Sequence, residues 1–324
     1  MANSPVRPAL YWADLLGTSA VAWGTFIGAW MTAPTSALYW VLLLVSSLAW
    51  IRGATFLHEL AHRRRDELPG IHAAWNLLIG FPATTPSLMG WHHAEHHNVS
   101  TYGTLQDPES APVATWSRRR LLGAIGIYVI VPWLLAIRFG FVAIVSHLHP
   151  KLRAHAVGKI STNDIYAEYT RPPVPPERRR AFITQELLCF VVVWVGLTAS
   201  ILGVLSWWFH LHRALLMTLA LLLNHARLLV QHRYEGWGEP TSLAAQTLDG
   251  VTLGPESPLT ELISPLGSRF HALHHELPAV PYHALPAAHR LLMEELPADH
   301  PYRDTIEPGF FAAWRRRWSE APSG

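Results

Sequence analysis

Residues 271–275 read His271-Ala-Leu-His274-His275, and this stretch decides how the rest of the chain is interpreted. Its three imidazoles, spaced i, i+3 and i+4, fall on one side of a helical turn. Two further groups precede it in the chain, His58-Glu-Leu-Ala-His62 and His92-His93-Ala-Glu-His96-His97. Because imidazole nitrogens are common ligands of transition metals, three such groups predict that distant parts of the sequence meet around metal.

The composition indicates a membrane protein. Half of the 324 residues are hydrophobic, only 15% are charged, and the mean hydropathy is +0.16. Many of the 15 Trp residues flank apolar runs, as aromatic side chains do at the membrane surface. The net charge of +2 gives no indication of a nucleic-acid partner. The only cysteine, Cys189, lies in an apolar run, so the sequence predicts neither a disulfide framework nor a thiolate metal site.

Four apolar runs are long enough to cross a bilayer as helices, since a span needs roughly 20 residues. These predicted spans are about 15–33, 36–57, 183–207 and 209–231. The apolar stretch 71–90 is broken by a glycine and two prolines, which favours an interfacial or re-entrant piece. The segment 121–146 has the length of a span but contains Pro132 and Arg138.

Parity of the spans decides the placement of residues 121–146. If this segment crossed the membrane, the third histidine group would face away from the first two. We therefore expect it to lie in the interface or to dip in and return. Four Arg triplets flank apolar or histidine-rich segments, which is typical of the cytoplasmic side: 63–65, 118–120, 178–180 and 315–317.

The predicted fold is accordingly all-α. We expect one membrane domain over residues 1–324, with about four transmembrane helices, interfacial helices and a cytoplasmic cap bearing the histidines. The cap is expected at about 91–180 and 232–324. We expect a multi-pass protein of the bacterial inner membrane, with its metal site on the cytoplasmic side.

The spacing of the histidines also predicts how many metals they hold. His58 and His62 are four residues apart, so a helix running through them presents both on one face. The second and third groups share the i, i+3, i+4 pattern, and together the three groups supply eight imidazoles, or four for each of two metals. An all-imidazole site suits Fe, Zn, Cu or Ni, so spacing alone does not name the metal.

The order and spacing of these groups resemble the three histidine boxes of the membrane fatty acid desaturase and hydroxylase superfamily. The surrounding residues also fit, including Gly103-Thr104, Asp107-Pro108-Glu109 and Pro281-Tyr282-His283, and the resemblance covers about residues 40–305. It implies two iron ions (Fe²⁺/Fe³⁺) and dioxygen as co-substrate. It also implies desaturation of a fatty-acyl or lipid chain, and a separate electron donor such as ferredoxin or a cytochrome. The implied ligands are His58, His62, His93, His96, His97, His271, His274 and His275.

Members of this superfamily often add one ligand from the end of the last span. Asn224, His225 and His232 are the candidates here, and we favour His232 because it follows the last predicted span as His58 ends the second. His92 is a possible extra ligand. A metal-bound histidine usually donates its second ring nitrogen to a carboxylate or carbonyl. Glu59 and Asp107 are the favoured partners, ahead of Glu95, Glu109, Glu235 and Glu276.

Three other functions remain open from the sequence. The same centre could hydroxylate a lipid, or act as a ketolase on a carotenoid. His58-Glu59-x-x-His62 is also the zinc metalloprotease pattern, and Asp249 could complete the site of an intramembrane protease. That alternative leaves the other clustered histidines without a role. A membrane metal carrier is the third possibility, although the predicted spans contain few polar residues.

Overall fold

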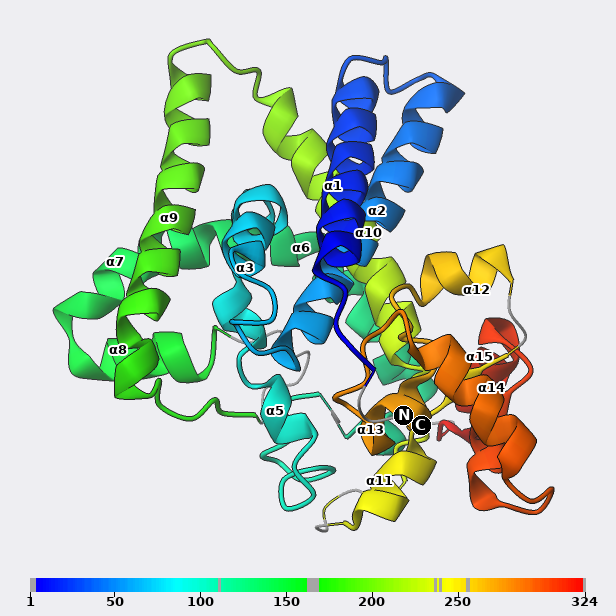
Figure 1. The fold of residues 1–324 in the computed structure, drawn as a ribbon. Coiled ribbons are helices and arrows are strands. Elements are labelled where there is room, and N and C mark those ends of the chain that lie inside the picture. The colour runs from blue at the N-terminus through cyan, green and yellow to red at the C-terminus, as the bar shows by residue number, and fades with distance from the viewer. Residues whose placement is uncertain are drawn as a thin grey trace.

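The computed structural model describes residues 4–109, 112–161, 169–235, 238, 241–254 and 257–322. Small parts of the predicted cap, such as 162–168, lie outside the described residues. Within the described ranges the protein is helical, apart from a pair of two-residue strands. The predicted all-α membrane fold is therefore confirmed (Figure 1).

Each of the four predicted spans overlaps one long helix. These are α1 (Pro8–Trp30), α2 (Ala37–Ala61), α9 (Pro176–Ile201) and α10 (Trp208–Leu228), although α1 and α9 begin and end several residues earlier than expected. α1 and α2 form a hairpin, in which the Ser46 hydroxyl donates to the carbonyl of Ala22 at 2.8 Å. Small residues at such a contact allow two helices to approach closely. α2 continues through His58 to Ala61, and His62 caps its C-terminal end, so both histidines emerge from one helix end.

A buried histidine joins α10 to this hairpin. Nδ1 of His212 is 3.0 Å from the Tyr39 hydroxyl, and its Nε2 is 3.1 Å from the carbonyl oxygen of Phe26. Both ring nitrogens are therefore paired, as a polar side chain inside a helical bundle requires. His212 thus contacts both α1 and α2 and fixes α10 beside them.

The apolar stretch 71–90 is broken, as its glycine and prolines predicted. It consists of α3 (Ile71–Trp75), the π-helical η1 (Asn76–Gly80), α4 (Phe81–Ala83) and the 3₁₀ turn η2 (Ser87–Gly90). The Trp75 indole donates to the carbonyl of Gly53 at 2.6 Å, which attaches this stretch to α2. A Cβ on Gly80 would lie 2.8 Å from the Trp75 ring, so this position accommodates glycine.

The segment after the second histidine box packs first against α10 and then against α9. It comprises α6 (Arg118–Ile137), η4 (Arg138–Val142), α7 (Ala143–Val145), η5 (Ser146–Leu148) and α8 (Pro150–Gly158). In α6 the carbonyl of Tyr128 accepts from Thr218 of α10, and in η4 the carbonyl of Gly140 accepts from Trp194 of α9. Figure 1 shows α6 behind α3, between these two helices.

The arginine inside this apolar segment has a buried partner. Arg138 pairs with Glu186 of α9 at 2.6 Å, and Arg153 of α8 pairs with the other oxygen of the same carboxylate. The Ser161 hydroxyl adds a further contact to Arg138 at 2.6 Å. Buried charges persist when they are paired and hydrogen-bonded, so this cluster anchors the segment to α9.

By length and composition, three described helical stretches could cross a membrane: Ala37–Ala61, Arg118–Leu148 and Pro176–Ile201. The second is the segment that we expected in the interface, and α1 and α10 do not meet the same criteria. Only 17% of the apolar window in α9 is buried inside the protein, so its outward face suits lipid. The number of spans therefore stays a prediction.

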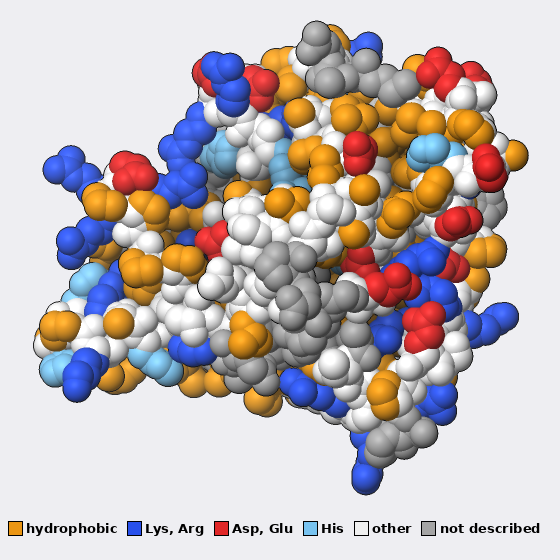
Figure 2. Space-filling view, turned by 90° about the horizontal axis from the view of Figure 1, so that it is seen from below, with side chains coloured by type: hydrophobic (Ala, Val, Ile, Leu, Met, Phe, Trp, Pro, Cys, Tyr) orange, Lys and Arg blue, Asp and Glu red, His pale blue; other side chains and the backbone are white. Residues whose placement is uncertain are grey.

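The remaining elements gather beyond one end of the long helices. They are α5 (His93–His96), η3 (Pro112–Thr115), α11 (Leu243–Asp249), α12 (Pro258–Ile263), α13 (His271–Glu276), α14 (Leu285–Glu295), η6 (Pro301–Thr305) and α15 (Phe310–Glu320), with parallel strands β1 (Thr252–Leu253) and β2 (Ile306–Glu307). In the strand pair Thr252 lies opposite Ile306. Figure 2 views this end of the molecule, where acidic and basic side chains lie among hydrophobic ones. Its mixed surface suits contact with water better than the apolar outer face of α9 does.

Candidate metal centre

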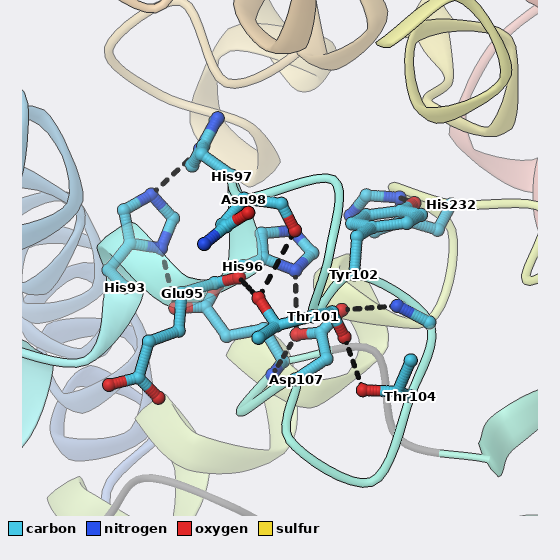
Figure 3. Close-up of polar contacts among 12 residues, drawn as sticks. His93, Glu95, His96, His97, Asn98, Thr101, Tyr102, Thr104, Asp107 and His232 are labelled. Atoms are coloured by element: carbon cyan, nitrogen blue, oxygen red, sulfur yellow. Dashed lines mark hydrogen bonds and ion pairs between the residues drawn. The ribbon is translucent and has the colours of Figure 1, made fainter. Parts of the chain in front are cut away.

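The three histidine boxes meet where α2, α5 and α13 converge. α2 supplies His58 and His62, α5 and its C-terminal end supply the second box, and α13 supplies the third. His232, which follows α10, joins them. Figure 3 shows several of these rings near one another, with His232 beside the second box.

The nine histidines form two groups, each with ligand nitrogens within 4.8 Å of one another. The five-histidine group consists of His58, His62, His93, His97 and His274, and the four-histidine group consists of His96, His232, His271 and His275. The rings of His97 and His275 stack with centroids 4.5 Å apart, so the two groups adjoin. The structure thus brings together all nine residues that we expected to be ligands.

The i, i+3, i+4 spacing explains how two short helices serve both groups. In α5 the i, i+4 pair His93 and His97 belongs to the five-histidine group, while His96 faces the other. In α13 the assignment is reversed, because His271 and His275 belong to the four-histidine group and His274 faces the first. Each helix therefore contributes histidines to both groups.

The Nε2 atoms face inward in both groups. Nε2 of His93 lies 2.9 Å from that of His62 and 3.1 Å from that of His97, and Nε2 of His271 lies 2.8 Å from that of His232. Nε2 of His58, His96 and His274 is buried without a hydrogen-bond partner among the described residues. Convergent, unpaired imidazole nitrogens fit a metal ion in each group, because a metal ion satisfies them together.

Burial keeps the third box in the form that binds metal. Burial, together with neighbouring imidazoles, lowers the pKa of His271, His274 and His275 well below the usual value for histidine. Neutral imidazole is the form that coordinates metal, so no proton has to be displaced near neutral pH.

Carboxylates hold the outward nitrogens of three ligands. Nδ1 of His96 is 2.9 Å from Asp107, Nδ1 of His93 is 2.6 Å from Glu109, and Nδ1 of His232 is 3.1 Å from Asp249. The Tyr102 hydroxyl is 2.9 Å from the same nitrogen of His232. Such contacts fix the tautomer that leaves Nε2 free for a metal.

These contacts agree only partly with the carboxylates that we favoured. Asp107 lies against a histidine as expected, and its loop is visible beside His96 in Figure 3. Glu59 instead accepts from the Tyr11 hydroxyl and pairs with Arg63 at 3.1 Å, so its partners are not the histidines beside it in sequence. The short loop from Asp107 to Glu109 brings Glu109 against His93. This contact depends on the geometry of the loop, which the spacing of residues in the sequence did not reveal.

Arg63 binds the third box to the end of α2. Its guanidinium donates to the carbonyls of Pro278, Ala279 and Val280 at 3.0, 2.7 and 3.3 Å. These carbonyls belong to the loop that follows α13. Arg63 belongs to one of the Arg triplets that we interpreted as membrane-flanking, but its side chain is buried.

The three possible extra ligands lie outside both groups. The His92 ring contacts Tyr169, with centroids 5.7 Å apart, and burial lowers the His92 pKa to about 3. Nδ1 of His225 is 3.0 Å from the Tyr128 hydroxyl. The Asn224 side-chain oxygen accepts from Arg227 at 2.9 Å.

A cavity of about 250 Å³ begins at the five-histidine group. His58 and His93 form part of its wall. The remaining wall is mostly apolar and comes mainly from α2, the 71–90 stretch, α6 and α10, including Trp50, Ile51, Ile79, Met217 and Leu221. Its polar residues include Glu109, His225 and Arg227. An apolar cavity that reaches a metal position suits the hydrocarbon part of a lipid.

The model of the fatty acid desaturase family matches residues 34–306. The chain belongs to this family. It is also similar to a protein named ceramide hydroxylase from Caulobacter vibrioides (strain NA1000 / CB15N), with 38% identity over 309 residues that cover 94% of this chain and 87% of the relative. The protein is therefore a membrane oxidoreductase that modifies lipid.

Family membership and site geometry both disfavour the protease alternative. His58 and His62 share their group with three more histidines, whereas Asp249 contacts His232 of the other group. Family membership in turn gives no support to the metal-carrier alternative.

Proposed function

We propose that this protein hydroxylates the hydrocarbon part of a ceramide-like lipid. The similarity to a ceramide hydroxylase over 94% of the chain carries this choice. The resemblance seen in the sequence favoured desaturation. Hydroxylation was the alternative, because it uses the same set of histidines. The family as a whole is named for desaturation, so product analysis has to separate the two.

The nine histidines are proposed to hold two iron ions, one in each group. Iron bound there would supply the activation of dioxygen, with two external electrons. Oxidation of an unreactive C–H bond requires this activation. The overall balance is R–H + O₂ + 2 e⁻ + 2 H⁺ → R–OH + H₂O. The electrons are proposed to come from a separate donor of the ferredoxin or cytochrome type.

The chain itself contributes binding, orientation and exclusion of water. The apolar walls between α2 and α10 bind the hydrocarbon chain, and the wall formed by His58 and His93 places one carbon next to the metal position. Glu109 holds the His93 ring through Nδ1, and Asp107 holds His96 in the same way. The ring orientations are therefore set before substrate enters.

We further propose that the site faces the cytoplasm of a bacterial cell from a multi-pass inner-membrane protein. The cap end has the mixed charges of a water-exposed surface, which fits a site outside the bilayer (Figure 2). A cysteine-labelling map with single cysteines in the loops before α2 and after α14 tests it. Labelling of both from the same side would contradict it.

Product analysis tests the proposed reaction directly. The protein is expressed in a host that lacks ceramide oxidation, supplied with ceramide, and total lipids are analysed by mass spectrometry. A product heavier than ceramide by one oxygen atom is expected, and the His275→Ala variant should yield none. A product lighter by two hydrogen atoms would instead establish desaturation.

A further inference from the structure

One histidine in the cavity wall is not explained by the metal centre. His225 of α10 is 3% exposed and lines the cavity together with His58 and His93. Its Nδ1 is 3.0 Å from the Tyr128 hydroxyl. Its Nε2 is buried and has no hydrogen-bond partner among the described residues.

The surroundings of His225 make this unpaired nitrogen informative. A buried polar atom without a partner is costly, so its retention calls for an explanation. His212, on the same helix, has partners for both ring nitrogens and is not among the residues that line the cavity. His225 therefore combines an unpaired ring nitrogen with a place in the wall of the cavity that substrate is proposed to fill.

The contact with Tyr128 fits either tautomer of the neutral His225 ring, because a hydroxyl can donate or accept. When the Tyr128 hydroxyl donates to Nδ1, the proton of the neutral ring lies on Nε2. Nε2 is then a hydrogen-bond donor, and its complement is an uncharged oxygen. Ceramide carries such oxygens in its amide carbonyl and in its hydroxyl groups.

We propose that Nε2 of His225 donates a hydrogen bond to one oxygen of the lipid, and that this contact determines which carbon reaches the metal position. The inference rests on the proposed function, because it assumes a lipid with a polar group near the oxidised carbon. Few polar groups in an otherwise apolar cavity are what fix the orientation of a ligand. A hydrocarbon chain without this contact would slide along the cavity and be oxidised at several carbons.

The test compares substrates as well as variants. The kcat/KM, the binding affinity and the oxidised position are measured for ceramide and for analogues that each lack one hydroxyl or the amide carbonyl. The variants are His225→Phe and His225→Gln, since glutamine keeps a donor. His212→Phe is the matched control, because it removes another buried histidine of α10 that does not line the cavity.

We expect His225→Phe to lower kcat/KM for ceramide about tenfold and to spread oxidation over neighbouring carbons. For the analogue that lacks the bound oxygen, His225→Phe should change kcat/KM little. His225→Gln should retain most of the activity on ceramide. Equal losses on all substrates, as in His212→Phe, would show that His225 is structural and overturn the inference. If wild-type protein neither binds nor oxidises ceramide, the proposed function itself fails.

Discussion

Replacing Arg63 with Met is expected to detach the third histidine box from α2. The Arg63 side chain is 3% exposed and pairs with Glu59, whose side chain is 4% exposed. It also donates to three carbonyls of the loop 278–280. The substitution leaves these three acceptors and one buried carboxylate without their cation.

Breaking a buried ion pair from one side costs about 3–5 kcal/mol. We expect the lower half of that range, because Glu59 keeps its bond from Tyr11 and accepts from the backbone N–H of Tyr282 at 3.4 Å. The double variant Glu59→Gln/Arg63→Met removes the uncompensated charge and should be less destabilised than Arg63→Met alone.

The assay is unfolding of the purified protein in mixed detergent micelles, together with iron content per chain. Arg64→Met is the matched control, because the neighbouring Arg64 side chain is 76% exposed and pairs with the exposed Asp66. Arg63→Met should lower the free energy of unfolding and release iron, whereas the control should do neither. Equal behaviour of the two variants would refute the role assigned to Arg63.

Three further predictions concern the site and its support. Asp107→Asn should weaken iron binding about 10–100-fold, measured by chelator competition, because it disturbs the partner of His96; unchanged affinity would contradict this. His62→Ala and His232→Ala should each impair one metal position, so each should retain about one iron by metal analysis; full retention in both would oppose two separate positions. His212→Phe should lower the free energy of unfolding by about 1–3 kcal/mol, because the Tyr39 hydroxyl and the Phe26 carbonyl lose their partner. The iron content of this variant should stay unchanged, and loss of iron would argue against a purely structural role.

Local spacing predicted a large part of this molecule. The i, i+4 relation of His58 and His62 required only that α2 continue through them, which it does. The breaks at Gly80 and the nearby prolines likewise act over a few residues. Both are consequences of backbone geometry that sequence displays directly.

Features that depend on the approach of distant segments were not predictable. Which ring of α5 or α13 serves which group depends on how the two short helices face each other. Arg63 and Arg64 are adjacent and identical in sequence, yet one is buried against the loop 278–280 and the other faces solvent. Glu59 was favoured because it lies within its box, but its buried partner is Arg63.

The central claim is that nine histidines hold two iron ions in adjacent positions. Metal analysis of the purified protein, combined with X-ray absorption at the iron edge, tests it most directly. The account predicts about two irons per chain, with scattering from the nearest atoms dominated by nitrogen. A single zinc per chain, together with lipid oxidation that survives replacement of His274 and His275 by alanine, would contradict it.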